Sequence, residues 1–191
     1  MLTLAIDTCC FYYSVALLRE SQVLFEIRSY EQNMQCEELV CKIESLLERS
    51  SLSYRELDLI AVTSGPGTFN GVRIGMSAAY GISLATGAKI VTVSTLEVMA
   101  YKEKANALCF TPDSQVGFFQ RFDRKFNPMS EISEVRLDEL TGEVLVFDIN
   151  GYDKSQVSNG VIAGLIAIQT GRKQSTLFYG KPPSIHVKNP G

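Results

Sequence analysis

The feature that most constrains this chain is a glycine-rich turn between an apolar run and an uncharged run. Residues 59–63 are largely apolar, residues 64–75 have the sequence Ser-Gly-Pro-Gly-Thr-Phe-Asn-Gly-Val-Arg-Ile-Gly, and residues 76–85 favour a helix. Glycine permits backbone angles that a Cβ resists, and proline fixes one backbone angle. The order predicts a strand, a tight turn and a helix, whose first N–H groups can hold an anion or a partner's backbone. A plain strand-to-helix connection is the alternative.

Composition and charge narrow the class of protein. The chain has 191 residues and a formal net charge of −3, with no cluster of lysine or arginine. This balance argues against tight binding to nucleic acid by the chain alone. The longest apolar run, residues 161–168, is far shorter than the roughly 20 residues that span a bilayer, and we see no signal peptide. We therefore expect a cytoplasmic protein that does not enter a membrane.

Five cysteines and a single histidine limit the metal chemistry. Cys9 and Cys10 are adjacent, no C-x-x-C pair occurs, and His186 lies near the end of the chain. We therefore expect no zinc site of the usual spacing, and free thiols in a reducing compartment. Redox sensitivity of the adjacent pair is the alternative to simple packing.

The first half alternates strands and helices. Three short apolar runs, 2–6, 13–18 and 23–28, have connections short enough for hairpins and predict a meander. Apolar residues at helical spacing then predict an amphipathic helix over 36–47. The remaining predicted elements are a strand at 59–63, a helix at 71–86 ended by Gly87, a strand at 90–93, and a helix at 96–101 capped by Ser94 or Thr95. This alternation predicts an α/β fold with a mixed sheet covered by helices.

The second half is less regular and predicts a smaller unit. Its expected elements are strands at 108–111, 117–122, 132–136 and 144–148, a helix at 158–170 and an extended tail at 181–191. The boundary falls between residues 103 and 106. We therefore expect two domains, residues 1–104 and 105–191.

The helix after the glycine-rich turn carries small residues at every fourth position. Gly71, Gly75, Ala79 and Ser83 form this stripe, and no charge occurs between residues 74 and 86. A helix that is apolar all round is buried on two sides. We expect the second side to meet another subunit, with methionine and tyrosine as typical interface residues; a second layer of the chain itself is the alternative. The predicted interface consists of Gly75, Met76, Ala79, Tyr80, Ser83, Leu39 and Ile43.

Three motifs resemble the TsaB (YeaZ) family, the smaller relatives of the TsaD proteins. They are Ile6-Asp7-Thr8 at the end of the first strand, the turn at 64–75, and Val93-Ser94-Thr95-Leu96-Glu97. The turn has Thr68, Asn70 and Val72 where the family usually has Ser, Thr and Leu. The resemblance covers the first half most specifically, and the second half is divergent. It implies the actin-like, ribonuclease H-like ATPase fold, with two related domains.

The resemblance also implies a role. TsaB-like proteins are non-catalytic subunits that pair with TsaD-like proteins and work with a TsaE-like ATPase. The complex transfers a threonylcarbamoyl group to the tRNA adenosine beside the anticodon. We therefore expect a heterodimer with a TsaD-like partner, a homodimer when that partner is absent, and contact with tRNA only through the complex.

An enzymatic role has two forms, and the sequence favours neither. A glycoprotease of the M22 type needs metal ligands, which a single histidine in a tail does not supply. An actin-like nucleotide-binding protein or weak ATPase needs glycine hairpins around the phosphates, and Thr8-Cys9-Cys10 brings bulk instead. We expect no required cofactor, with weak or vestigial nucleotide binding as the alternative. The degenerate nucleotide or anion loops would consist of Asp7, Thr8, Gly65, Gly67, Thr68 and Arg73.

Overall fold

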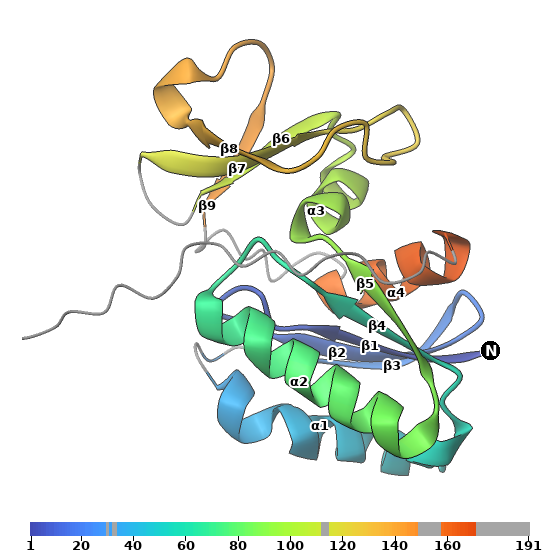
Figure 1. The fold of residues 1–191 in the computed structure, drawn as a ribbon. Helices are drawn as coiled ribbons and strands as arrows, with labels where there is room; N and C mark the ends of the chain where they lie inside the picture. The colour runs from blue at the N-terminus through green and yellow to red at the C-terminus, as the bar shows by residue number, and fades with distance from the viewer. Residues whose placement is uncertain (30, 32–33, 112–114, 149–157, 171–191) are drawn as a thin grey trace, which may run out of the picture.

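The computed structural model describes residues 1–29, 31, 34–111, 115–148 and 158–170. The predicted tail at 181–191 lies outside these residues. The described chain forms an α/β fold with two mixed sheets (Figure 1). This confirms the predicted fold class.

The first sheet has five strands in the order β3-β2-β1-β4-β5. The strands are β1 (Leu2–Asp7), β2 (Ser14–Arg19), β3 (Gln22–Arg28), β4 (Leu59–Thr63) and β5 (Lys89–Val93). The first three form the predicted antiparallel meander, and β1, β4 and β5 are parallel. Strand β1 is therefore central, and its last residue, Asp7, lies at the end where the parallel strands finish.

Helices cover both faces of this sheet, which is why β1 and β4 are buried along their whole length. Helices α1 (Gln35–Arg49) and α2 (Phe69–Thr86) lie on one face, and α3 (Thr95–Glu103) and α4 (Asn159–Thr170) lie on the other (Figure 1). Alternate side chains of β1 enter the two cores: Leu4 and Ile6 face α1 and α2, and Ala5 faces α4.

The predicted helix ends are confirmed. Gly87 ends α2 in the left-handed conformation, with φ of 80°. Ser94, rather than Thr95, begins α3: its hydroxyl accepts a 3.0 Å hydrogen bond from Glu97 N, and the Glu97 carboxylate accepts one from Ser94 N.

The second sheet repeats the start of the first on a smaller scale. Its strands are β6 (Ala107–Thr111), β7 (Val116–Arg121), β8 (Ser133–Arg136) and β9 (Leu145–Asp148), in the order β8-β7-β6-β9. Strands β6, β7 and β8 are antiparallel neighbours, and β9 is parallel to β6. Two short 3-10 turns, η1 (Tyr54–Glu56) and η2 (Leu137–Glu139), complete the described elements.

The last helix packs across the predicted domain boundary. Helix α4 belongs by sequence to the expected second unit, 105–191, yet it packs on the first sheet (Figure 1). Its side chains Val161, Ala163 and Ile166 share a core with Ala5 and Ala61. The chain therefore returns to the first sheet after it builds the second sheet.

Candidate functional site

The glycine-rich turn rests directly on the connection between β1 and β2. A Cβ at Gly67 would overlap the carbonyl oxygen of Cys9, and one at Gly71 would overlap that of Thr8. A Cβ at Gly75 would overlap the Thr8 hydroxyl. These glycines are therefore needed because the backbone passes so close to β1, and the stripe of small residues faces the chain's own strand.

Hydrogen bonds join the same two segments. The Thr8 hydroxyl donates to the carbonyl of Gly71 at 2.6 Å, and Thr68 N donates to the carbonyl of Cys9 at 2.6 Å. The Thr68 side chain begins α2 by accepting a 3.0 Å hydrogen bond from Gly71 N. Gly65, with φ of 92°, occupies the left-handed region that glycine favours. The Thr8 hydroxyl, Thr68 N and Gly71 N could each donate to an anion, but all three donate hydrogen bonds within the protein instead.

Asp7 lies next to this turn and is buried. Its Oδ1 accepts hydrogen bonds from the Thr63 hydroxyl at 2.6 Å and from Cys9 N at 3.3 Å. The Asn159 side chain at the start of α4 also donates to it. Burial raises the pKa of Asp7, and these hydrogen bonds oppose part of that rise. The carboxyl group therefore connects three elements and is closed off from a ligand in solution.

The two adjacent cysteines are equally enclosed. Burial, with the nearby Asp7 carboxyl as a smaller cause, raises the pKa of Cys9 to about 12 and that of Cys10 well above its usual value. A thiol reacts through its thiolate, so both side chains are chemically quiet. They pack in two different cores, Cys9 under α1 and α2 and Cys10 under the second sheet.

Five of the seven predicted interface residues are buried within the chain itself. Gly75, Met76 and Ala79 are buried against the first sheet, and Leu39 and Ile43 lie in the core that α1 and α2 share. The periodicity identifies a tightly packed face, but that face meets the chain's own sheet. This face of α2 therefore packs against the chain's own sheet, which was the alternative to a subunit interface.

The outer, solvent-exposed face of α2 consists of other residues than the small-residue stripe. Tyr80 is 40% exposed and Leu84 is 91% exposed, and Val40 on the neighbouring α1 is 56% exposed. Tyr80 was predicted, but Leu84 and Val40 were not. Ser83, also predicted, is half-buried and donates to the carbonyl of Ala88 at 2.7 Å. Helical spacing could have indicated Leu84, which lies four residues after Tyr80 and opposite the small stripe.

Arg73 lies near the N-terminal end of α2. It is exposed, and its guanidinium lies 3.5 Å from the centre of the Phe69 ring. This cation–π contact holds the guanidinium over the Phe69 ring of the same helix. The predicted loop residues therefore separate: Asp7, Thr8, Gly65 and Gly67 are internal, and Arg73 is on the surface.

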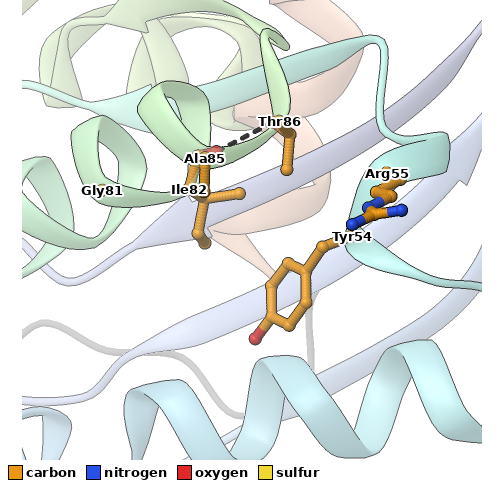
Figure 2. Close-up of a pocket in the computed structure, with 6 residues that line it drawn as sticks. All are labelled: Tyr54, Arg55, Gly81, Ile82, Ala85 and Thr86. Atoms are coloured by element: carbon orange, nitrogen blue, oxygen red, sulfur yellow. Dashed lines mark hydrogen bonds between the residues drawn. The ribbon is translucent and has the colours of Figure 1, made fainter.

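Two hollows open on the side formed by α1 and α2. One, of about 340 Å³, lies between the first halves of the two helices. The other, of about 390 Å³, lies between η1 and the last turns of α2. Figure 2 shows Tyr54 and Arg55 of η1 across from Ile82, Ala85 and Thr86, with the Tyr54 hydroxyl directed toward α1. Gly81 widens this second hollow because nothing lies within 4 Å of where its Cβ would be.

Within the described residues, no three His, Cys, Asp or Glu side chains gather as metal ligands would. The described helices are also too short or too polar to cross a membrane.

Comparisons with known proteins agree with the first-half motifs. The family described as tRNA N6-adenosine threonylcarbamoyltransferase, TsaD, matches residues 35–114, which include α1 and α2. The tRNA threonylcarbamoyladenosine biosynthesis protein TsaB of Escherichia coli K12 is 30% identical over 162 residues, 75% of this chain and 69% of that protein.

The likeness is uneven along the chain. The TsaB protein of Bacillus subtilis strain 168 is 35% identical over 100 residues, 52% of this chain but only 44% of that protein. This chain thus spans less than half of the Bacillus protein. The solved structure of YeaZ from Pseudomonas aeruginosa matches with a TM-score of 0.66 over 90% of this chain and 95% of that one, at 20% identity. The YeaZ likeness confirms the fold that the motifs implied.

Proposed function

The chain belongs to the TsaB family, and we propose that it is a non-catalytic subunit that pairs with a TsaD-like protein in tRNA threonylcarbamoyladenosine biosynthesis. The proposed contact surface is the outer face of α1 and α2, centred on Val40, Tyr80 and Leu84. Contact with a TsaE-like ATPase and with tRNA would be made through the assembled complex. Self-pairing through the same face would occur when the partner is absent.

The exposed apolar face is the observation that carries this proposal. Leu84 is almost fully exposed, and α2 carries no charged residue between Ile74 and Thr86. Water-exposed apolar side chains that cluster on a helical face favour association, because burial removes their apolar surface from water. The match to the TsaD family covers these two helices, which supports a shared pairing surface.

The environment of Asp7 supports the non-catalytic part of the proposal. In an actin-like enzyme the acid at the end of the first strand must be open to a nucleotide or its metal. Here Thr63, Cys9 and Asn159 donate hydrogen bonds to its carboxyl group, which is only 2% exposed. We propose that the chain needs no nucleotide or metal for its role.

Co-expression with the TsaD-like protein of the same genome tests the pairing. Size-exclusion chromatography with light scattering should give a one-to-one complex for the unmodified chain. Leu84→Glu should weaken the complex at least tenfold, because a charge replaces a buried apolar contact. Met129→Glu is the matched control, since Met129 is also strongly exposed but belongs to the second half. Equal losses for both variants, or no complex at all, would contradict the proposal.

A further inference from the structure

The hollow between η1 and the last turns of α2 has apolar walls and room for a side chain. Tyr54 lines one side of it, and Ile82 and Ala85 line the other (Figure 2). Among the described residues, nothing outside the helix backbone lies within 4 Å of the position that a Cβ on Gly81 would take. The volume of about 390 Å³ accepts one large side chain, because pockets of about 300–1,000 Å³ hold whole small molecules.

Arg55 brings a charge to the edge of this apolar space. It lines the hollow, it is exposed, and within the described residues it forms no hydrogen bond or ion pair. The other polar side chain in the lining is already used: the Thr86 hydroxyl donates to the Ile82 carbonyl at 2.8 Å and accepts from Ala88 N at 3.1 Å. The Arg55 guanidinium is therefore the group in the lining that can bind a polar partner from outside.

The carboxylates that flank Arg55 in sequence are engaged elsewhere. Glu56 accepts hydrogen bonds from Ser53 N at 2.8 Å and from the Ser53 hydroxyl at 3.1 Å. Asp58 accepts one from Leu2 N at 2.6 Å. A guanidinium presents several N–H donors in a plane and pairs best with a carboxylate. The hollow thus combines an apolar space with a cation that its sequence neighbours leave available.

We propose that this hollow receives an apolar side chain of the TsaD-like partner, and that a carboxylate beside that side chain pairs with Arg55. Burial in the hollow removes apolar surface from water, and the guanidinium favours an acidic neighbour over a basic one. The hollow adjoins the proposed contact face, because Gly81 and Ala85 are exposed on α2 next to Tyr80 and Leu84. The source of the side chain rests on the function proposed above.

Filling the hollow from inside tests the apolar half of the proposal. Gly81→Leu has open space for its side chain and a better helix former than glycine, so the free chain should be at least as stable. Affinity for the TsaD-like protein should fall at least tenfold, because the leucine takes the place of the partner's side chain. Gly81→Ala is the matched control: it gains the same helix preference, leaves most of the hollow open and should keep the affinity within about threefold.

Three outcomes of this test would overturn the inference. One is an affinity of Gly81→Leu within twofold of the original, and another is an equal loss with Gly81→Ala. The third is a loss of self-association in the free chain with unchanged affinity for the partner, since the hollow would then receive a second copy of this chain.

Reversing the charge at the edge of the hollow tests the acidic half. Arg55→Glu should weaken the complex about tenfold at low salt, and the loss should shrink in 0.5 M NaCl because salt screens exposed charges. Arg124→Glu is the matched control. Arg124 is also exposed and without an ion pair in the described chain, but it lies between β7 and β8. Equal losses for the two variants would mean that only net charge matters, which would overturn the inference.

A further measurement needs no partner protein. 4-Phenylbutyrate joins an apolar ring to a carboxylate, and 4-phenylbutanamide has the same ring and chain without the charge. Titration of each, followed through the NMR signals of Gly81 and Ala85, should show at least threefold tighter binding of the carboxylate, and Arg55→Gln should remove that difference. Equal binding of the two compounds, or binding of neither, would overturn the inference even if the partner complex forms. Failure of the complex together with selective binding of the carboxylate would contradict only the proposed function.

Discussion

The Thr63 hydroxyl donates a 2.6 Å hydrogen bond to Oδ1 of Asp7, which joins the ends of neighbouring strands β4 and β1 inside the protein. Cys9 N and the Asn159 side chain approach the same carboxyl group. Asp7 therefore connects β1 to the first turn of α4.

The buried carboxyl group should make stability depend on pH. Burial raises the pKa of Asp7 in the folded protein, so the folded chain holds that proton more tightly than the unfolded chain. The stability from Asp7 is fully present below the unfolded pKa of about 3.9 and is lost as the pH rises through the folded value. Asp7→Asn should therefore gain stability relative to the original chain as the pH rises. Urea unfolding at several values between pH 4 and pH 8 measures this difference, and a constant difference would contradict it.

Two glycines of α2 should respond to alanine in opposite directions. A Cβ at Gly71 would overlap the backbone carbonyl of Thr8, which cannot move aside as a side chain can. Gly71→Ala should cost about 1–3 kcal/mol of the free energy of unfolding. Gly81 has open space around its Cβ position, so Gly81→Ala should stabilise the helix by about 0.5–1 kcal/mol. Denaturant unfolding of both variants tests the contrast, and changes of the same sign would refute it.

Thiol labelling should divide the cysteines into two groups. Cys36 and Cys41 are exposed on α1, whereas Cys9, Cys10 and Cys109 are buried. Burial also raises the pKa of the three buried thiols, which lowers their thiolate population further. At pH 7.5 an aromatic disulfide reagent should react quickly with two thiols, and with all five only after unfolding. Fast reaction of a third thiol would contradict this division, because it would show that one of the three buried cysteines becomes accessible readily.

The sequence predicted the local elements well, because each depends on neighbours within one turn or strand. Short apolar runs with short connections predicted the meander, helical spacing predicted α1, and Ser94 or Thr95 predicted the start of α3. The glycine-rich turn was also identified correctly as a strand-to-helix connection. These signals are short-range, so a single sequence carries them.

The neighbours of each element were harder to predict. The stripe of Gly71, Gly75 and Ala79 indicated a close approach, but spacing alone does not say whether the approaching surface belongs to the same chain. Helix α4 is apolar on most sides and sits after the second sheet in sequence, so nothing local revealed that it packs on the first. The hollow beside Arg55 forms between η1 and α2, which β4 separates in sequence, and could be found only in the structure.

The return of α4 to the first sheet leads to a last prediction. Gly160 N, in the first turn of α4, donates a 2.9 Å hydrogen bond to the Ser14 hydroxyl at the start of β2, and both groups are buried. Ser14→Ala leaves that N–H without its acceptor, which should cost about 1–3 kcal/mol. Ser77→Ala, on the exposed side of α2, should change the free energy of unfolding by less than about 0.5 kcal/mol. Hydrogen exchange should then show faster opening of α4 than of β1 in the Ser14 variant. Uniform exchange across both elements would mean that α4 and the first sheet unfold only as one unit.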